Sequence, residues 1–128
     1  MRGRTGAGIL LVEDHRLTRT QLSEMLKSAF PDCRVGAAET TDEALRECRR
    51  AAPAVMVTDI HLPDSSGIEL VRLVLSQFPD IRVVMHSNHD LEIFREQSAA
   101  AGACAFVSKA SGPAVLLAEI DRLLKPAA

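Results

Sequence analysis

Several side chains able to support phosphoryl chemistry each follow a short apolar run in this sequence. Glu13 and Asp14 follow the first run and Asp59 the third, while Ser87 and Lys109 lie at the ends of later ones. An aspartate can attack phosphorus to form an acyl phosphate, and a lysine, a hydroxyl and a metal can stabilise the transferring group. Clustered carboxylates repel one another unless a cation is present, and Mg²⁺ suits oxygen ligands. The pattern predicts that Asp59 accepts a phosphoryl group.

The elements that must position these residues are predicted from apolar runs that alternate with helical patterns. Runs that are apolar along their whole length are typical of strands buried on both faces of a parallel sheet. We expect strands at 8–12, 33–38, 54–58, 81–86 and 104–107. The helices are expected at 16–30, 41–52, 66–78, 90–101 and 112–124. Thr40 and Ser111 are predicted to cap the second and fifth helices, and Gly102 to end the fourth. Five strands alternating with five helices indicate a doubly wound α/β fold.

Composition limits the classes of function that the chain can have. Its 128 residues suffice for one domain, and 47% are hydrophobic, which favours a packed globule. A net charge of −2 gives no basic footprint for nucleic acid, so we expect no nucleic-acid binding. No apolar run reaches the length of a membrane span, and the N-terminus lacks the apolar stretch of a signal peptide. We expect no membrane association, a flexible lead at 1–7, one domain at 8–125 and a tail at 126–128.

The cysteines indicate the compartment. Three cysteines, an odd number with no metal-ligand spacing, argue against disulfides. They are predicted to be free, buried thiols in a reducing cytoplasm.

The order and spacing of the motif residues carry a family resemblance from about Gly8 to Leu124. The motif positions are the pair Glu13-Asp14, Asp59 with Pro63 and Gly67, Ser87, and Phe106 with Lys109. The chain resembles the receiver domain of bacterial two-component response regulators, in the CheY-like superfamily. The segment AFVSKAS resembles receivers of the NarL/FixJ (LuxR-class) transcription factors, which carry a helix-turn-helix domain after the receiver. Residues 126–128 are therefore a tail or the start of a linker.

The resemblance implies a fold, a partner and a role for each motif residue. The fold would be flavodoxin-like, with strand order 2-1-3-4-5, and the donor a phosphohistidine on a sensor histidine kinase in a bacterial cytoplasm. Activation would change the surface of the fourth helix, fifth strand and fifth helix, with possible homodimer formation. By the resemblance, Asp59 is the phosphoacceptor. The ligands of Mg²⁺ (or Mn²⁺) would be Asp14, Asp59, the His61 carbonyl and, through water, Glu13. Lys109 and Ser87 would contact the phosphoryl group, and Ser87 and Phe106 would be the switch residues.

Three histidines could also suggest a transition-metal site. His86 should face away from Ser87 on its strand, so His61, His86 and His89 are not expected to converge. His61 and His89 each lie two residues after a key position. We expect them to flank the phosphoryl group and to tune its hydrolysis, the alternative being that both are solvated loop residues.

Two other functions remain open from the sequence. One is an interaction module of the same fold that is never phosphorylated, against which the complete acidic site argues. The other is an aspartate-nucleophile phosphatase or phosphotransferase. Such enzymes commonly need a second acidic residue two positions after the nucleophile, where this chain has His61. We therefore expect a chain that catalyses only its own phosphorylation and dephosphorylation.

Overall fold

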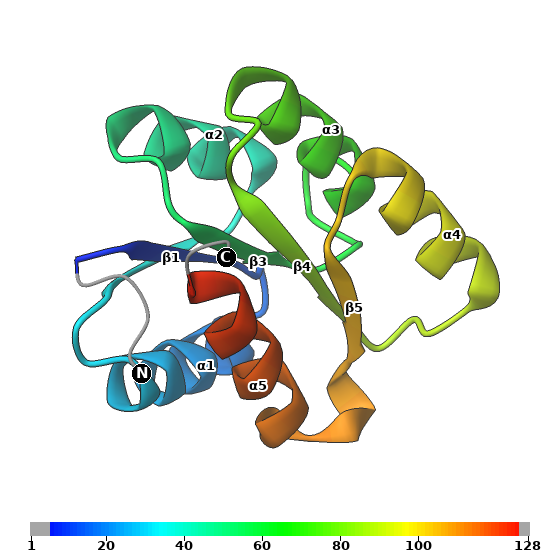
Figure 1. Cartoon of the computed structure of the whole chain (residues 1–128). Helices are drawn as coiled ribbons and strands as arrows, with labels where there is room; N and C mark the ends of the chain where they lie inside the picture. The colour runs from blue at the N-terminus through cyan, green and yellow to red at the C-terminus, as the bar shows by residue number, and fades with distance from the viewer. Residues whose placement is uncertain (1–5, 126–128) are drawn as a thin grey trace.

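Five parallel strands form a single sheet in the computed structural model, which describes residues 6–125 (Figure 1). The strand order is β2-β1-β3-β4-β5, so the predicted doubly wound α/β fold and its order are confirmed. The strands are β1 (Gly8–Val12), β2 (Arg34–Ala38), β3 (Val55–Thr58), β4 (Arg82–Ser87) and β5 (Ala105–Ser108). The helices are α1 (Arg16–Ala29), α2 (Thr41–Arg50), α3 (Gly67–Gln77), α4 (Glu92–Ala101) and α5 (Pro113–Leu124).

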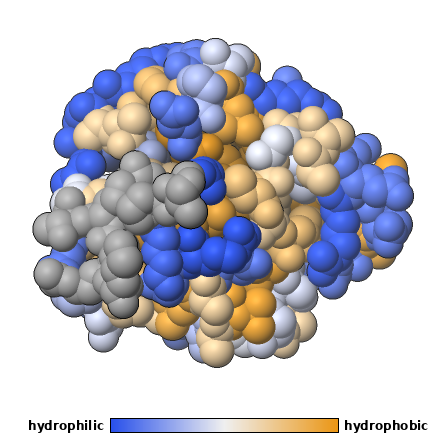
Figure 2. Space-filling view, viewed as in Figure 1, coloured by the Kyte–Doolittle hydropathy of each residue, from blue (hydrophilic) through white to orange (hydrophobic). Residues whose placement is uncertain are grey.

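Two layers of helices cover the two faces of the sheet. Side chains alternate across a strand, so Leu10 and Val12 of β1 pack on one core while Ile9 and Leu11 pack on the other. Helices α2, α3 and α4 cover the first face, and α1 and α5 cover the second (Figure 1). Figure 2 shows hydrophobic residues running through the middle of the same view to its lower margin, with hydrophilic residues at the upper left and at the right. This burial on both faces explains the continuous apolar strands.

Most predicted element ends agree with the structure to within one or two residues. The Oγ1 of Thr40 accepts a hydrogen bond from Glu43 N at 3.1 Å, as the capping pattern predicts. Gly102 ends α4 in the left-handed conformation with φ 111°. The predicted cap at Ser111 is wrong. Residues Lys109–Ser111 form a 3-10 turn, Gly112 with φ 87° precedes α5, and the Ser111 hydroxyl donates to the Ser108 carbonyl.

The three cysteines are free, as predicted, but only Cys48 is buried; Cys33 is half-buried and Cys104 is exposed. Burial raises the pKa of the Cys48 thiol to about 11. No helix within residues 6–125 combines the length and the hydrophobicity needed to cross a membrane. Residues 1–5 of the predicted lead and the predicted tail at 126–128 lie outside the described residues.

Candidate functional site

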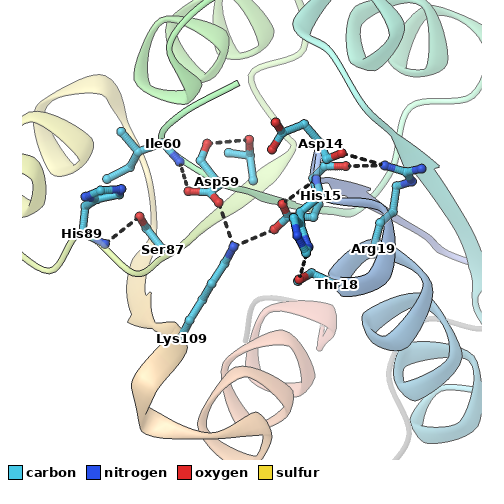
Figure 3. Close-up of polar contacts among 11 residues, drawn as sticks. Asp14, His15, Thr18, Arg19, Asp59, Ile60, Ser87, His89 and Lys109 are labelled. Carbon is cyan, nitrogen blue, oxygen red and sulfur yellow. Dashed lines mark hydrogen bonds and ion pairs between the residues drawn. The ribbon is translucent and has the colours of Figure 1, made fainter. Parts of the chain in front are cut away.

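Three of the predicted site residues meet where the strands end at their carboxyl edge (Figure 3). The Nζ of Lys109, just after β5, lies 2.7 Å from Glu13 Oε1 and 2.7 Å from Asp59 Oδ2. The Glu13 side chain is 3% exposed, and those of Asp59 and Lys109 are 13% and 16% exposed. Because all strands run parallel, residues 96 positions apart in the chain come into direct contact at this edge.

The ammonium of Lys109 is the cation that compensates both carboxylates. Burial on its own would lower the pKa of Lys109, but hydrogen bonds from its ammonium to Asp59 and Glu13 outweigh burial. The pKa of Lys109 therefore lies above its ordinary value, and the side chain carries its charge throughout the neutral range. Such a fixed positive charge can stabilise the negative oxygens of a transferring phosphoryl group.

Asp59 is held in place by the first turn after β3. Its Oδ1 accepts a hydrogen bond from Ile60 N at 2.7 Å, and its carbonyl accepts one from Thr58 Oγ1 at 3.0 Å. Gly67 packs directly on this carbonyl, because a Cβ at position 67 would lie 1.8 Å from Asp59 O. The glycine eight residues after Asp59 is thus required by the close approach of α3 to the backbone of Asp59.

The loop between Asp59 and α3 is tied to a neighbouring helix by Asp64, which sequence reasoning missed. Its carboxylate accepts hydrogen bonds from Thr41 N at 2.9 Å, Thr41 Oγ1 at 2.6 Å and Asp42 N at 3.2 Å. These donors are at the N-terminus of α2, where backbone N–H groups lack helical partners. Asp64 therefore anchors the loop that follows Asp59. A capping residue 23 positions away leaves no local signal in the sequence.

A second missed residue, Arg19, holds the acidic turn after β1. Its Nη1 donates to the carbonyl oxygens of Glu13 at 3.0 Å and Asp14 at 3.2 Å, and its Nη2 lies 3.3 Å from Glu39 Oε1. The Glu13 carboxylate also accepts a hydrogen bond from His15 N at 3.0 Å. Asp14 itself is exposed. The turn is thus fixed through its backbone, which leaves the Asp14 carboxylate open to solvent.

The donor set fits a hard divalent cation, although no group of three or more His, Cys, Asp or Glu side chains within residues 6–125 is already arranged as a metal site. Lys109 lies between two of the carboxylates instead. The formal charges of the site sum to −2, from the carboxylates of Glu13, Asp14 and Asp59 and the ammonium of Lys109. One Mg²⁺ would neutralise this charge. All the candidate ligands are oxygens, which Mg²⁺ prefers.

The predicted switch hydroxyl and His89 lie on one side of Asp59 in Figure 3, and His89 contacts a second histidine. Ser87 is fully buried, and its Oγ accepts a hydrogen bond from His89 N at 3.0 Å (Figure 3). The rings of His61 and His89 meet edge to face, with centroids 4.4 Å apart. The structure therefore brings the rings of His61 and His89 into contact, while their predicted role at the phosphoryl group stays a prediction.

His86 lies on the other face of β4, as predicted, among residues of α1 and α5. Burial, followed by the charge of Lys109, lowers the pKa of His86 to about 4, against the opposing charge of Asp59. The three histidines do not converge on one point, which agrees with the sequence prediction.

Phe106 lies on β5 and is half-buried against the core beneath α4. The guanidinium carbon of Arg95 lies 4.7 Å from the centroid of its ring. Arg95 is a third residue that sequence reasoning did not single out.

Comparison with known proteins points to one family. A family model described as the response regulator receiver domain matches residues 9–121. The chain is 38% identical to the transcriptional activator protein ExaE of Pseudomonas putida over 118 residues, which are 91% of this chain and 55% of ExaE. The chain spans about half the length of the curated relatives it matches.

Solved structures of similar fold agree with this match. A LuxR-family two-component response regulator from Aurantimonas sp. SI85-9A1 shares 31% identity with a TM-score of 0.86, covering 93% of this chain and 85% of that one. The BeF3-activated receiver domain of DrrB, a Thermotoga maritima protein, shares 28% identity with a TM-score of 0.84, covering 93% and 97%.

Proposed function

Since this chain belongs to the response regulator receiver domain family, we propose that its Asp59 carboxylate accepts a phosphoryl group and thereby switches a regulatory output. The observation that carries the proposal is the position of Asp59 at the end of β3, 2.7 Å from Lys109, which also contacts the buried Glu13. A lone carboxylate at a strand end would need neither partner.

The transfer is a single displacement at phosphorus. An Asp59 carboxylate oxygen attacks the phosphorus of a phosphohistidine on a sensor histidine kinase, the P–N bond breaks, and the imidazole leaves with the electron pair. The product is an acyl phosphate on Asp59. Lys109 stabilises the negative charge on the transferred oxygens, and the Asp64 anchor keeps the loop after Asp59 in place during the approach of the donor.

Receiver domains of this family generally bind Mg²⁺ at the phosphorylation site, interact with sensor kinases and often dimerise. In this chain Asp14, Asp59, the His61 carbonyl and, through water, Glu13 would hold Mg²⁺ (or Mn²⁺). The ion would supply positive charge that offsets the charge on the phosphoryl oxygens. The two uncompensated negative charges of the acidic cluster support this assignment.

Phosphorylation adds about two negative charges beside Ser87. The Ser87 hydroxyl then turns away from His89 N, from which it accepts a hydrogen bond, and donates one to a phosphoryl oxygen. Phe106 turns inward to fill the vacated space. This changes the surface formed by α4, β5 and α5. The transcriptional activator among the relatives supports control of transcription as the output. The free thiols support a reducing, cytoplasmic setting.

The test is incubation with acetyl phosphate and Mg²⁺, followed by intact-mass measurement. Wild type and Asp80→Asn, which alters an exposed carboxylate outside the site, should gain one phosphoryl group. Asp59→Asn should gain none, and chelation of Mg²⁺ should abolish the gain in wild type and in Asp80→Asn. A wild-type chain that gains no mass, or an equal gain in Asp59→Asn, would favour the alternative, an interaction module of this fold that is never phosphorylated.

We also propose that His61 and His89 set the lifetime of the acyl phosphate. Their contact next to Asp59 supports a role in shielding or orienting the attacking water. Replacing each with Ala should change the first-order rate of dephosphorylation, measured after removal of the donor. Unchanged rates in both variants would leave them as solvated loop residues.

A further inference from the structure

Arg95 of α4 connects two segments that the proposed switch moves separately. Its guanidinium carbon lies 4.7 Å from the Phe106 ring centroid on β5. Its Nη2 donates to Asp90 Oδ2 at 3.1 Å, and its Nε donates to Asp90 Oδ1. Asp90 belongs to the loop between β4 and α4, which begins directly after Ser87 and also contains His89. One side chain therefore bridges this loop and the switch aromatic.

The geometry of the guanidinium serves both contacts at once. Two bonds to one carboxylate fix the plane of the group, and a fixed plane can lie over an aromatic face. The side chains of Arg95 and Asp90 are 44% and 39% exposed, so water and salt weaken the pair. The two contacts together are therefore favourable but modest, and a phosphorylation event can overcome them.

Both movements of the proposed switch would break these contacts. If the Phe106 ring turns inward, it leaves the guanidinium that covers it. If Ser87 turns toward a phosphoryl group, it must give up the hydrogen bond from His89 N, and the loop that moves includes Asp90. The contacts of Arg95 with Asp90 and Phe106 therefore oppose both movements, the inward turn of the Phe106 ring and the shift of the loop that contains Asp90.

We propose that Asp90 and Arg95 form a latch that holds the chain in its resting conformation and sets the population of the active conformation before phosphorylation. Arg95 is a positioning residue, since it acts through Phe106 and the loop rather than on the phosphoryl group. The proposal rests on the proposed function, because the latch needs a switch to hold. Contacts of this kind at exposed sites change a two-state equilibrium by about two- to fivefold.

The chain has four phenylalanines and neither tryptophan nor tyrosine, so ring-¹³C-labelled Phe gives a simple NMR spectrum in which Phe106→Leu identifies the Phe106 signal. Wild type is compared with and without beryllofluoride and Mg²⁺, which mimic phosphorylation. Arg95→Gln and Asp90→Asn, without beryllofluoride, should shift the Phe106 signal part of the way toward its activated position. Arg72→Gln removes an ion pair of similar exposure on α3 and should not shift it.

A second readout follows from linkage. A chain already biased toward the active conformation binds beryllofluoride more tightly by the same factor. Arg95→Gln should therefore need about two- to fivefold less beryllofluoride for half-saturation, while Arg72→Gln matches wild type. If wild type responds to beryllofluoride but Arg95→Gln equals Arg72→Gln in both readouts, the latch is wrong and the proposed function stands. If the Phe106 signal of wild type does not respond at all, the proposed switch fails, and the latch with it.

Discussion

The contact between Lys109 and two carboxylates dominates the site at the scale of single residues. The Glu13 side chain is nearly inaccessible to water, and the ammonium of Lys109 lies 2.7 Å from its carboxylate. Breaking such a pair by removing one partner leaves an uncompensated charge in a poorly solvated place, which costs more than the pair itself contributes. The charge of Lys109 therefore stabilises the resting fold in addition to any role in phosphoryl transfer.

We predict that Lys109→Met lowers the free energy of unfolding by about 2 kcal/mol at neutral pH without divalent cations, less than for a fully buried pair because Lys109 is partly exposed. Adding Glu13→Gln to Lys109→Met should recover about half of this loss, since the most buried of the facing charges is then absent. Urea unfolding followed by circular dichroism measures both effects.

The matched control is Lys125→Met, which removes a lysine whose pair with Asp121 is about half exposed. It should change stability by less than about 0.5 kcal/mol. Equal losses in Lys109→Met and Lys125→Met, or no recovery by Glu13→Gln, would contradict the compensating role of Lys109.

The sequence predicts the positions of Asp59, Glu13 and Lys109 well because strand ends of a parallel sheet meet at one edge. It says nothing of Arg19, since an arginine reaching from a helix to a backbone carbonyl has no characteristic spacing. It also expects three converging carboxylates, whereas Lys109 contacts two of them and Asp14 faces solvent. That arrangement depends on side-chain conformation, which a pattern of residue types does not determine.

The loop after β3 and the start of α2 form one unit at the scale of elements. Three hydrogen bonds from Thr41 and Asp42 to the Asp64 carboxylate join them. The Glu43 N–H in the same turn donates to the Thr40 hydroxyl. Hydrogen bonds from Thr41, first from its side chain and then from its backbone, hold the pKa of the Asp64 carboxyl below its usual range. Asp64 thus stays charged, and remains an acceptor, well below neutral pH.

We predict that Asp64→Ala destabilises the chain by about 1 kcal/mol, the usual effect of losing a helix cap. Amide hydrogen exchange at Thr41 and Asp42 should become faster, while exchange in the core of β4 changes only in proportion to global stability. The difference in free energy of unfolding between wild type and Asp64→Ala should shrink in acid, as pH falls through the lowered pKa of Asp64. Asp80→Ala is the control, and exchange at Thr41 that matches this control would contradict the anchor.

The one wrong cap shows where element prediction from sequence reaches its limit. Ser111 has the residue type and the position of a helix cap, and Pro113 follows in a first turn as expected. The Ser111 hydroxyl donates instead to the Ser108 carbonyl within the 3-10 turn, while Gly112 adopts positive φ to start α5. Two local hydrogen-bonding options for one serine differ little in energy, and the surrounding fold selects between them.

The strand order belongs to the scale of the whole molecule, and the residues alone do not specify it. Alternating helices and strands predict a parallel sheet, but several doubly wound orders satisfy that pattern. The family resemblance supplied the order 2-1-3-4-5, which the structure confirms. This order places β1 and β3 side by side, and so brings Glu13 and Asp59 within reach of one lysine.

Global stability should depend on pH through His86, which is buried and lies among residues of α1 and α5. Its pKa of about 4 lies below the ordinary value of 6.5, so the unfolded chain binds a proton that the folded chain rejects. The stabilisation due to neutral His86 is complete above pH 6.5 and is lost as pH falls toward 4. We predict that this group removes about 2 kcal/mol of stability between pH 7 and pH 5.

Replacing His86 with Gln removes the titration, because glutamine stays neutral in both states. The variant should start less stable than wild type at pH 7, since glutamine fits the site less well, and should lose less stability on acidification. His15→Gln, which removes an exposed imidazole, should keep the steeper dependence of wild type. Urea unfolding at several pH values gives the three curves. Parallel curves for wild type and His86→Gln would show that acid destabilisation comes from the carboxylates instead, since both chains share those groups.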